Sequence, residues 1–584
     1  MEHTKNVSEP AWYRFYDQRT PRTLTYPEIT IDYFLDEAAG SDPDKRAVTF
    51  ILKYLLGGRA MIGGKLTYRQ LREAADRFAT ALADLGVRKG DRIAVMLPNS
   101  PQFVIAFFAA MRLGAVVVNT NPTYTPREIK HQVEDSGAET IVLLNLFLPR
   151  LREIQSELPH LKRVIVTHIF DTLPFPSSAL VRRAQKKEPD WVEVQTDDQT
   201  LLFGDLLKRY PPAPPKVERS PNDVALFQYT GGTTGLPKAA MLTHRNIVSN
   251  VLQIKAWLPD GQRGTERVMC AIPFFHVYGM TVAMLYSVAM AADMLIVPNP
   301  RPIDNVMRII DKERATVFPG VPAMYIGIIN HPDLASYNLR SVRACISGSA
   351  PLPMEVQERF GELTGGRLVE GYGLTEAAPV THCNPIYGQR KSGSIGIPFP
   401  DVEAKIVDLE TGEEIPPGSD RQGELCVRGP QVMIGYWNRP EETAETIDSD
   451  GWLHTGDIAT IDSDGYFYIV DRKKDMIIAS GYKILPREVE EVLYTHPKVL
   501  EAVVAGVPDS YRGETVKAYI VPKPGEEPTV EEIIAHCKAN LAPYKVPKLI
   551  EFRTELPKTI VGKVLRRILV EEEKKKLAEQ KAQA

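Results

Sequence analysis

Residues 229–238 read YTGGTTGLPK, and the rest of the chain is organised around this stretch. Its three glycines alternate with hydroxyl residues, and the run closes on Pro237 and Lys238. Glycine lets a backbone come close to a ligand, successive free amides form a concave anion site, and lysine adds positive charge. The composition therefore predicts a loop that binds a polyphosphate. A glycine-rich surface turn is the alternative, although it is less typical of a run this long.

The flanks of this loop differ from those of a Walker P-loop. Leu236 and Pro237 separate Gly235 from Lys238, so the pattern G-x-x-x-x-G-K-[ST] is not met. Residues 224–228 and 239–242 are short apolar runs that predict strands, and helical spacing begins only after Thr243. The sequence thus predicts a strand, a glycine loop and a second strand.

Composition and charge narrow the class of protein. The 584 residues are too many for one core, and the net charge of -4 gives no reason to expect nucleic acid binding. The five scattered cysteines contain no Cys-x-x-Cys, which argues against a disulfide framework or a zinc site. No secretory signal is visible, and the longest uncharged apolar run, residues 277–292, is shorter than the ~20 residues of a spanning helix and predicts a buried helix instead. We expect a cytoplasmic protein, and the sequence leaves peripheral membrane contact and a homodimer open.

Strand and helix patterns alternate along much of the chain. Helical spacing over residues 71–85 ends at Gly86, residues 92–96 predict a strand, and Ser100 with Pro101 opens a helix. Such alternation predicts an α/β fold with parallel-type sheets covered by helices. Past Gly393 the pattern changes to short strands and turns, with a hairpin signal at Asp464-Gly465.

The charged break DRKKD at residues 471–475 marks the predicted domain boundary. We expect a large N-terminal domain, residues 1–471, with α/β sheets and a β-rich subdomain. A small mobile α+β domain, residues 472–584, follows, with a hinge near Lys474. Its charged tail, residues 571–584, is expected to be a solvated helix.

The loop YTGGTTGLPK resembles the phosphate loop of the adenylate-forming, AMP-producing ligases, which include acyl-CoA synthetases, aryl-CoA ligases, luciferases and peptide-synthetase adenylation domains. Further stretches resemble motifs of the same family in the family's order: EGYGLTE (370–376), WLHTGD (452–457), DRKKD (471–475) and LPKTIVGK (556–563). The resemblance covers residues 67–563. It is strongest to bacterial and archaeal long-chain fatty acyl-CoA synthetases, through QYTGGTTGLPKAAMLTHRN and the DRKKD break.

The resemblance implies an ATP site with Mg²⁺. Tyr372 would face the adenine, Thr375 the α-phosphate and Glu376 the metal, because an aromatic ring can stack on a base and a carboxylate suits Mg²⁺. Asp457 would hold the ribose hydroxyls with Arg472 beside it, although this chain has Asp-Arg where many members carry Gly-Arg. The predicted ATP-binding residues are Thr230, Gly231, Gly232, Thr233, Thr234, Gly235, Lys238, Gly348, Ser349, Ala350, Glu370, Gly371, Tyr372, Asp457 and Arg472, with Glu376 and Thr230 on the metal.

The resemblance also assigns roles near the C-terminus. Lys563 would reach the α-phosphate and stabilise the negative charge that develops there. Lys474 would be the hinge. The loop Ser480, Gly481 and Tyr482 would swing in to line the coenzyme A tunnel, although a simple β-turn fits these residues as well.

The stretch PFFHVYGM, residues 273–280, resembles the segment beside the acyl pocket of the family. We assign His276 a gating or carboxylate-positioning role, and with Lys563 and Thr375 it completes the predicted catalytic set; a packed histidine is the alternative. The predicted acyl-pocket residues are Phe275, Tyr278, Met280 and Val321. The aspartate with which amino-acid-activating relatives hold the substrate ammonium is missing here, which argues against an amino acid substrate.

These features predict an AMP-forming acid–thiol ligase. A fatty acid, medium to long in chain, would react with ATP to give acyl-AMP and pyrophosphate, and coenzyme A would then take the acyl group. Two alternatives stay open: an aryl-CoA ligase or luciferase-like adenylating enzyme, and a nucleotide- and lipid-binding protein without turnover.

Overall fold

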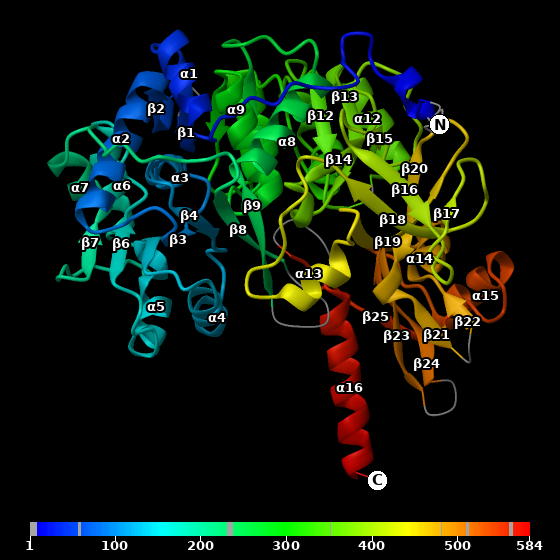
Figure 1. Ribbon diagram of the computed structural model, residues 1–584. Coiled ribbons are helices and arrows are strands. Elements are labelled where there is room, and N and C mark those ends of the chain that lie inside the picture. The colour runs from blue at the N-terminus through cyan, green and yellow to red at the C-terminus, as the bar shows by residue number, and fades with distance from the viewer. Residues whose placement is uncertain are drawn as a thin grey trace.

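A computed structural model describes residues 9–55, 60–230, 237–350, 352–479, 482–509, 513–559 and 564–583 (Figure 1). The first body is a seven-stranded sheet in the order β7-β6-β5-β3-β4-β8-β9, parallel throughout except for the antiparallel pair β8–β9. Its strands are β3 (Arg92–Met96), β4 (Val116–Asn119), β5 (Thr140–Leu144), β6 (Arg163–Thr167), β7 (Thr200–Leu202), β8 (Val224–Thr230) and β9 (Lys238–Thr243). Its helices are α2 (Tyr68–Asp84), α3 (Pro101–Leu113), α4 (Pro126–Ser136), α5 (Leu148–Ile154), α6 (Ser177–Gln185), α7 (Phe203–Arg209) and α8 (His244–Trp257).

Local signals in the sequence set the ends of these helices. Thr67, Thr125 and Thr243 each form a capping box at the start of a helix, and Ser100 caps α3 with Pro101 in the first turn. Gly114 ends α3 with φ 64°, a left-handed conformation that glycine adopts without strain. The two strands predicted on either side of the glycine loop and the helix predicted after Thr243 are confirmed.

Two four-stranded sheets, β10-β11-β1-β2 and β12-β13-β14-β15, lie next to this body (Figure 1). Single-residue bridges through Val317 connect β10 to β12. The strands are β1 (Arg46–Leu55), β2 (Ala60–Thr67), β10 (Arg267–Cys270), β11 (Asp293–Ile296), β12 (Ala344–Ser347), β13 (Arg367–Gly373), β14 (Val380–Cys383) and β15 (Ile397–Pro398). The helices are α1 (Tyr33–Ser41), α9 (Tyr286–Ala289), α10 (Asp304–Glu313), α11 (Pro322–Ile329) and α12 (Met354–Thr364).

The apolar run at residues 277–292 is buried, as predicted, but it is not one regular α-helix. Residues Gly279–Leu285 form a π-helical segment, η5, that continues into α9. In the part of the chain that the structure describes, no helix is long and apolar enough to cross a membrane.

The predicted β-rich part is a five-stranded antiparallel sheet in the order β17-β16-β18-β19-β20. It contains β16 (Glu403–Val407), β17 (Glu414–Ile415), β18 (Gly423–Arg428), β19 (Leu453–Ile461) and β20 (Phe467–Arg472), with α13 (Pro440–Thr446) beside it. Asp464 and Gly465 form the predicted turn between β19 and β20.

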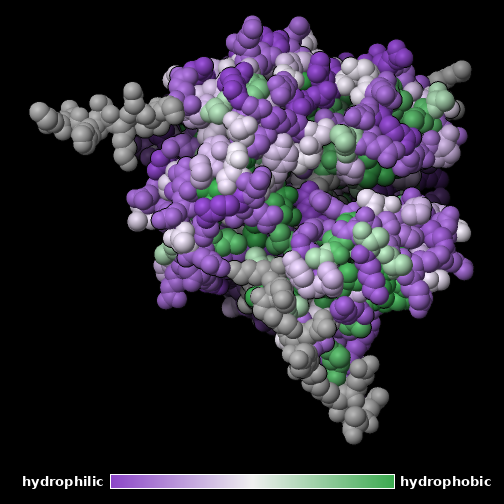
Figure 2. Space-filling model, turned by 90° about the vertical axis from the view of Figure 1, so that its right-hand side faces the viewer, coloured by the Kyte–Doolittle hydropathy of each residue, from purple (hydrophilic) through white to green (hydrophobic). Residues whose placement is uncertain are grey.

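The last hundred residues form a separate sheet with its own apolar clusters. It contains β21 (Ile477–Ala479), β22 (Tyr482–Ile484), β23 (Val499–Asp509), β24 (Gly513–Pro522) and β25 (Leu549–Phe552), with α14 (Pro486–Tyr494), α15 (Val530–Asn540) and α16 (Arg566–Gln583). Figure 2, which views the molecule from the side of these elements, shows hydrophobic patches on this part of the surface. Several apolar side chains here are exposed, among them Ile478, Tyr494, Leu500 and Leu549. Short 3-10 turns complete the chain at η1 (Ala11–Phe15), η3 (Asn145–Phe147), η4 (Gln155–Glu157), η6 (Leu334–Ser336), η7 (Thr375–Ala377) and η8 (Lys473–Asp475).

The charged tail is not solvated along its whole length, and this part of the prediction is wrong. Glu573 is buried and accepts a hydrogen bond from Lys517 Nζ at 2.6 Å, while Leu569, one turn earlier, is fully buried. The first turns of α16 therefore pack on the C-terminal sheet, through Leu569 in an apolar cluster and through Glu573 beside Lys517, which also pairs with Glu551 at 2.8 Å.

Candidate active site

Several predicted site residues lie where strands of the seven-stranded sheet and of the sheet containing β13 end. Thr230 ends β8 and is paired with Lys238 at the start of β9, so these two residues frame the glycine loop. The short helix η7, which carries Thr375 and Glu376, packs against both β8 and β9. The structure therefore brings the EGYGLTE segment to the ends of the glycine loop.

Lys238 and Glu376 share a partner, Tyr436. The ammonium group of Lys238 lies 5.2 Å from the ring centroid of Tyr436, and the Tyr436 hydroxyl donates to Oε1 of Glu376 at 2.7 Å. Burial and the neighbouring Glu376 raise the pKa of Tyr436, so the hydroxyl stays a donor at neutral pH. Positive charge and an oriented carboxylate thus lie together, an arrangement that suits phosphate and Mg²⁺.

Sequence reasoning did not single out Tyr436. It lies on residues 433–437, which run beside β9: the N–H of Met241 donates to Gly435 O and the N–H of Trp437 donates to Ala239 O, both at 2.9 Å. The N–H of Met433 also donates to the backbone oxygen of Glu376 at 2.8 Å. The stretch VMIGYW has no alternation that would predict a strand, so no local signal pointed to it.

Tyr372, Asp457 and Arg472, taken from three different motifs, are in direct contact. The hydroxyl of Tyr372 donates to Oδ2 of Asp457 at 2.5 Å, and Nε of Arg472 lies 3.2 Å from Oδ1 of the same carboxylate. Asp457 and Arg472 are also partners in the β19–β20 register. Burial and the Asp457 charge hold the pKa of Tyr372 well above its usual value, which keeps the hydroxyl protonated.

The Asp-Arg sequence leaves this arrangement intact. Arg472 lies opposite Asp457 in the strand register. The side chain of Asp471 is buried and accepts backbone hydrogen bonds. Its Oδ1 accepts from the N–H of Arg472 and its Oδ2 from the N–H of Arg487, both at 2.7 Å. Asp471 therefore ties β20 to the first turn of α14.

Glu370 is a buried carboxyl group on β13. Its Oε2 accepts from the N–H of Leu352 at 3.2 Å, and burial raises its pKa to about 7, while that N–H and the charge of Arg487 act in the opposite direction. Three residues further, Gly373 has no room for a side chain, since a Cβ atom would lie 2.0 Å from Pro379 O. This tight packing fixes the segment that presents Tyr372.

The predicted acyl-pocket residues connect the seven-stranded sheet to the neighbouring sheet that contains β12. The Tyr278 hydroxyl donates to Ile346 O at 2.7 Å, and a Cβ atom at Gly348 would meet the Tyr278 ring at 3.1 Å. On the other side, Nε2 of Gln228 donates to Phe275 O at 3.1 Å. Met280 and Val321 are buried.

His276 is half-buried, and its Nδ1 accepts from the N–H of Tyr278 at 3.2 Å. Ser349, on the loop after β12, has φ 70°, and Ala350 follows it. The roles predicted for these residues remain predictions.

Several predicted residues lie outside the described part of the chain: Gly231, Gly232, Thr233, Thr234, Gly235, Ser480, Gly481 and Lys563; the side chains of Lys474 and Tyr482 are likewise not described. Within the described ranges, no group of three or more His, Cys, Asp or Glu side chains could hold a metal ion. The donor set fits Mg²⁺ nevertheless, because Mg²⁺ is commonly held by one or two carboxylates together with substrate phosphates, and Glu376 lies beside the phosphate-binding charge.

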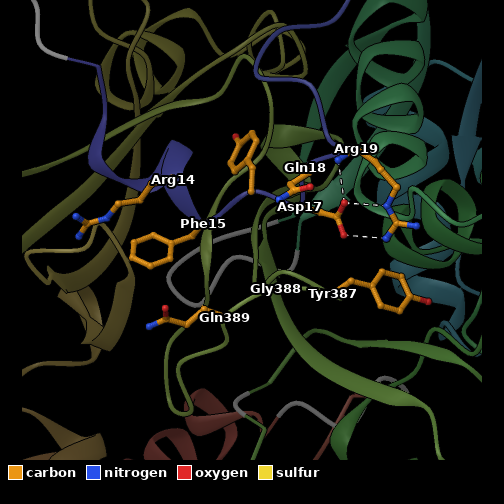
Figure 3. Close-up of a pocket in the computed structure, with 9 residues that line it drawn as sticks. Arg14, Phe15, Asp17, Gln18, Arg19, Tyr387, Gly388 and Gln389 are labelled. Atoms are coloured by element: carbon orange, nitrogen blue, oxygen red, sulfur yellow. Dashed lines mark hydrogen bonds and ion pairs between the residues drawn. The ribbon is translucent and has the colours of Figure 1, made fainter.

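An open pocket of about 610 Å³ lies elsewhere, between the N-terminal segment and the loop after β14 (Figure 3). Arg14 and Arg19 line it from one segment and Tyr387 from the other, with the guanidinium carbon of Arg19 5.4 Å from the ring centroid of Tyr387. Nε and Nη2 of Arg19 donate to the two carboxylate oxygens of Asp17, at 2.9 and 2.8 Å. No predicted site residue lines this pocket, so it is separate from the candidate active site.

Comparison with known proteins agrees with this geometry. The family model described as AMP-binding enzyme matches residues 35–437, and that described as AMP-binding enzyme C-terminal domain matches residues 488–563. The long-chain-fatty-acid–CoA ligase of Bacillus subtilis is 46% identical over 97% of this chain and 98% of its own, and that of Escherichia coli O6:H1 is 42% identical over 88% and 91%.

A crystal structure of the anthranilate CoA ligase AuaEII in complex with anthranoyl-AMP has the same fold. The TM-score is 0.80 at 28% identity, over 95% of this chain and 99% of the other. The resemblance and the fold class inferred from the sequence are thereby confirmed. This chain belongs to the family of AMP-binding enzymes.

Proposed function

We propose that the chain joins a long-chain fatty acid to coenzyme A in two steps. A carboxylate oxygen of the acid attacks the α-phosphorus of ATP, the bond to the pyrophosphate group breaks, and acyl-AMP and pyrophosphate form. The coenzyme A thiol then attacks the acyl carbon, giving acyl-CoA and AMP. The full-length similarity to long-chain-fatty-acid–CoA ligases supports this substrate class.

One observation carries the proposal. Tyr372 and Glu376 belong to one short segment, yet the first contacts Asp457 and Arg472 while the second contacts Tyr436 beside Lys238. One end of this segment thus lies with residues suited to bind a ribose and an adenine, and the other end with residues suited to bind phosphate and Mg²⁺. A nucleoside triphosphate has its base and ribose at one end and its phosphates at the other, so it matches this arrangement.

The residues of the chain would act mainly by alignment and charge neutralisation, because phosphoryl and nucleotidyl transfer need little covalent help. Glu376 and Thr230 would hold Mg²⁺, which supplies charge neutralisation on the phosphates when bound. Lys238 adds a fixed positive charge near the same place. Arg472 and Tyr372 fix the two oxygens of the Asp457 carboxylate, so that this group is oriented before a ribose arrives.

The C-terminal part would serve both steps. We place the domain boundary between residues 471 and 472 and the hinge at Lys474, with Lys563 on the mobile domain acting on the α-phosphate. The loop Ser480, Gly481 and Tyr482 would line the path of the thiol after rotation. The separate sheet formed by β21–β25 supports this division.

Pyrophosphate release tests the proposal. Wild-type protein with ATP and Mg²⁺ should release pyrophosphate with palmitate-like acids faster than with coumarate or luciferin, and coenzyme A should convert this into continuous AMP formation. Glu376→Gln should lose about 100-fold or more of this activity, and Glu445→Gln, an exposed acid on α13, serves as the matched control. Faster turnover of coumarate would favour an aryl-CoA ligase, and no turnover of any acid would favour a binding protein.

Three further features are part of the proposal: a cytoplasmic location, a homodimer and peripheral contact with membranes. Light scattering coupled to size-exclusion chromatography tests the dimer. The membrane contact has a structural basis of its own, described next.

A further inference from the structure

Residues 173–187 form an outlying apolar and basic surface on the N-terminal body. Phe175 is 84% exposed, the highest value among the large apolar side chains of the described residues, and Leu180 is 54% exposed. The helix that follows Phe175, α6, contains no buried residue. We call Phe175, Leu180, Arg182, Arg183, Lys186 and Lys187 the α6 surface. Figure 1 shows α6 at the end of the molecule away from the C-terminal elements.

The exposed residues Phe175 and Leu180 belong to a segment that is fixed to the rest of the fold. Leu173 is buried, Pro174 abuts Gly64 of β2 so closely that a Cβ atom there would lie 3.1 Å from Cδ of the proline, and Val181 packs on the core. The backbone is tied as well, since the N–H of Ser178 donates to Pro174 O at 2.9 Å. Leu173 and Val181 therefore anchor a segment in which Phe175 and Leu180 remain exposed.

The same helix presents positive charge next to these apolar groups. Arg183 follows Leu180 by three residues on α6, so the two side chains are neighbours on the helix surface, and Lys186 and Lys187 lie in the turn directly after the helix. Among the described residues, Arg182, Arg183 and Lys187 form no ion pair, whereas Lys186 lies 3.5 Å from Glu193 and 5.7 Å from the Trp191 ring centroid. The charged residues of α6 itself are Arg182 and Arg183; Lys186 and Lys187 follow in the next turn, and the acidic Glu188 and Asp190 come after them.

We propose that the α6 surface docks on the anionic face of a lipid bilayer, with Phe175 and Leu180 entering the interface and the four basic side chains meeting the headgroups. Apolar residues flanked by long cationic ones are typical of interfacial helices, since lysine and arginine can cover apolar surface and still reach charged headgroups. A protein partner would be expected to meet a groove or a larger apolar patch, whereas the large apolar side chains that the α6 surface exposes are Phe175 and Leu180. The inference rests on the proposed function, because a long-chain fatty acid partitions into bilayers and would be collected there.

Flotation with lipid vesicles tests the proposal on the full-length protein. Wild type should bind vesicles of phosphatidylcholine and phosphatidylglycerol and bind pure phosphatidylcholine much more weakly. Phe175→Ser with Leu180→Ser should weaken binding about tenfold or more. Changing Arg182, Arg183, Lys186 and Lys187 to Gln should weaken it about fivefold per charge and remove its salt dependence.

The controls match each change elsewhere on the surface. Leu500→Ser replaces an apolar residue of similar exposure, 48%, on β23. Lys574→Gln with Lys575→Gln removes basic charge from another helix, α16. These controls should bind like wild type. All α6 variants should keep wild-type turnover of octanoate, which dissolves as a monomer, and should lose turnover of palmitate presented in vesicles.

Two results would overturn the proposal. One is a wild type that stays unbound with both kinds of vesicle, which would leave the surface to a protein partner. The other is binding by the α6 variants equal to that of wild type. Neither result affects pyrophosphate release with dissolved acid, so failure here is distinguishable from failure of the proposed function.

Discussion

The carboxylate of Asp471 accepts a hydrogen bond from the backbone N–H of Arg487 at 2.7 Å. Nη1 of Arg487 donates in turn to Ile469 O, also at 2.7 Å. These two bonds connect β20, the last strand of the β-rich sheet, to α14 of the C-terminal sheet. Ile469 precedes the DRKKD segment, Asp471 is its first residue and Arg487 follows it, so the two bonds span the segment in which the proposed hinge is placed.

Asp471→Ala should loosen this connection. The change removes a buried charged acceptor from two N–H groups, and hydrogen bonds to charged groups contribute about 2 kcal/mol each. Hydrogen exchange at the amides of Arg472 and Arg487 should accelerate about 10-fold or more. The exposed Asp420→Ala is the control. Unchanged exchange at both amides would show that Asp471 does not hold the two elements together.

Tyr372→Phe should weaken the site without unfolding the chain. The variant keeps the ring but leaves Asp457 with Arg472 as its charged partner, so the carboxylate is less well oriented. We expect the KM for ATP to rise about tenfold, corresponding to the ~1.5 kcal/mol of a hydrogen bond to a charged group. Tyr468→Phe, which removes a 3.2 Å bond to Asp462 on the same sheet, is the control and should leave the KM for ATP unchanged. An equal effect of both variants would argue that the Tyr372 hydroxyl has no special role.

Glu370 should make the folded state less stable as pH rises. Burial raises its pKa to about 7 in the folded protein, above the ordinary value of a glutamate, so the folded state holds the proton more tightly than the unfolded state. The stabilisation is present at low pH and is lost as pH rises from the ordinary value through about 7.

Glu370→Gln should abolish this loss. Between pH 5 and pH 8 the variant should gain about 3 kcal/mol in free energy of unfolding relative to wild type. Urea unfolding of both proteins at the two pH values measures the gain. A difference between the proteins that does not change with pH would mean that Glu370 does not titrate in this range.

Local signals in the sequence were sufficient for much of the first body. Threonine caps with a glutamine, glutamate or asparagine three residues on specify where three of the helices begin, and the parallel sheet followed from the alternation of helices with apolar runs. The association of Tyr372, Asp457 and Arg472 was predicted only through the family resemblance. No spacing rule connects residues 85 positions apart, as Tyr372 and Asp457 are.

The features that sequence reasoning missed depend on tertiary contacts. Tyr436 acts through a strand-like segment that pairs with β9 from almost two hundred residues away. The charged residues 571–584 predict a solvated helix, yet Glu573 is buried beside Lys517 on β24, which also lies 2.8 Å from Glu551. The Asp471 side chain connects β20 to α14, and no local pattern in the sequence predicts that these two elements lie side by side.

Lys563 and Lys474 allow the two half-reactions to be separated. Lys563→Ala should slow acyl-adenylate formation about 100-fold or more and leave thioester formation from supplied acyl-AMP largely intact. Lys474→Pro should do the reverse, since proline fixes the backbone at the proposed hinge. Equal loss of both half-reactions in Lys563→Ala, or normal overall turnover in Lys474→Pro, would contradict the division of labour.

Exchange of labelled pyrophosphate into ATP is the most direct measurement of the central claim, that this chain activates a fatty acid as its adenylate. With Mg²⁺, ATP and a long-chain fatty acid, exchange should occur without coenzyme A, should require the acid, and should fall about 100-fold in Glu376→Gln. Exchange that is absent with every carboxylic acid offered, or that proceeds equally without any acid, would contradict the account.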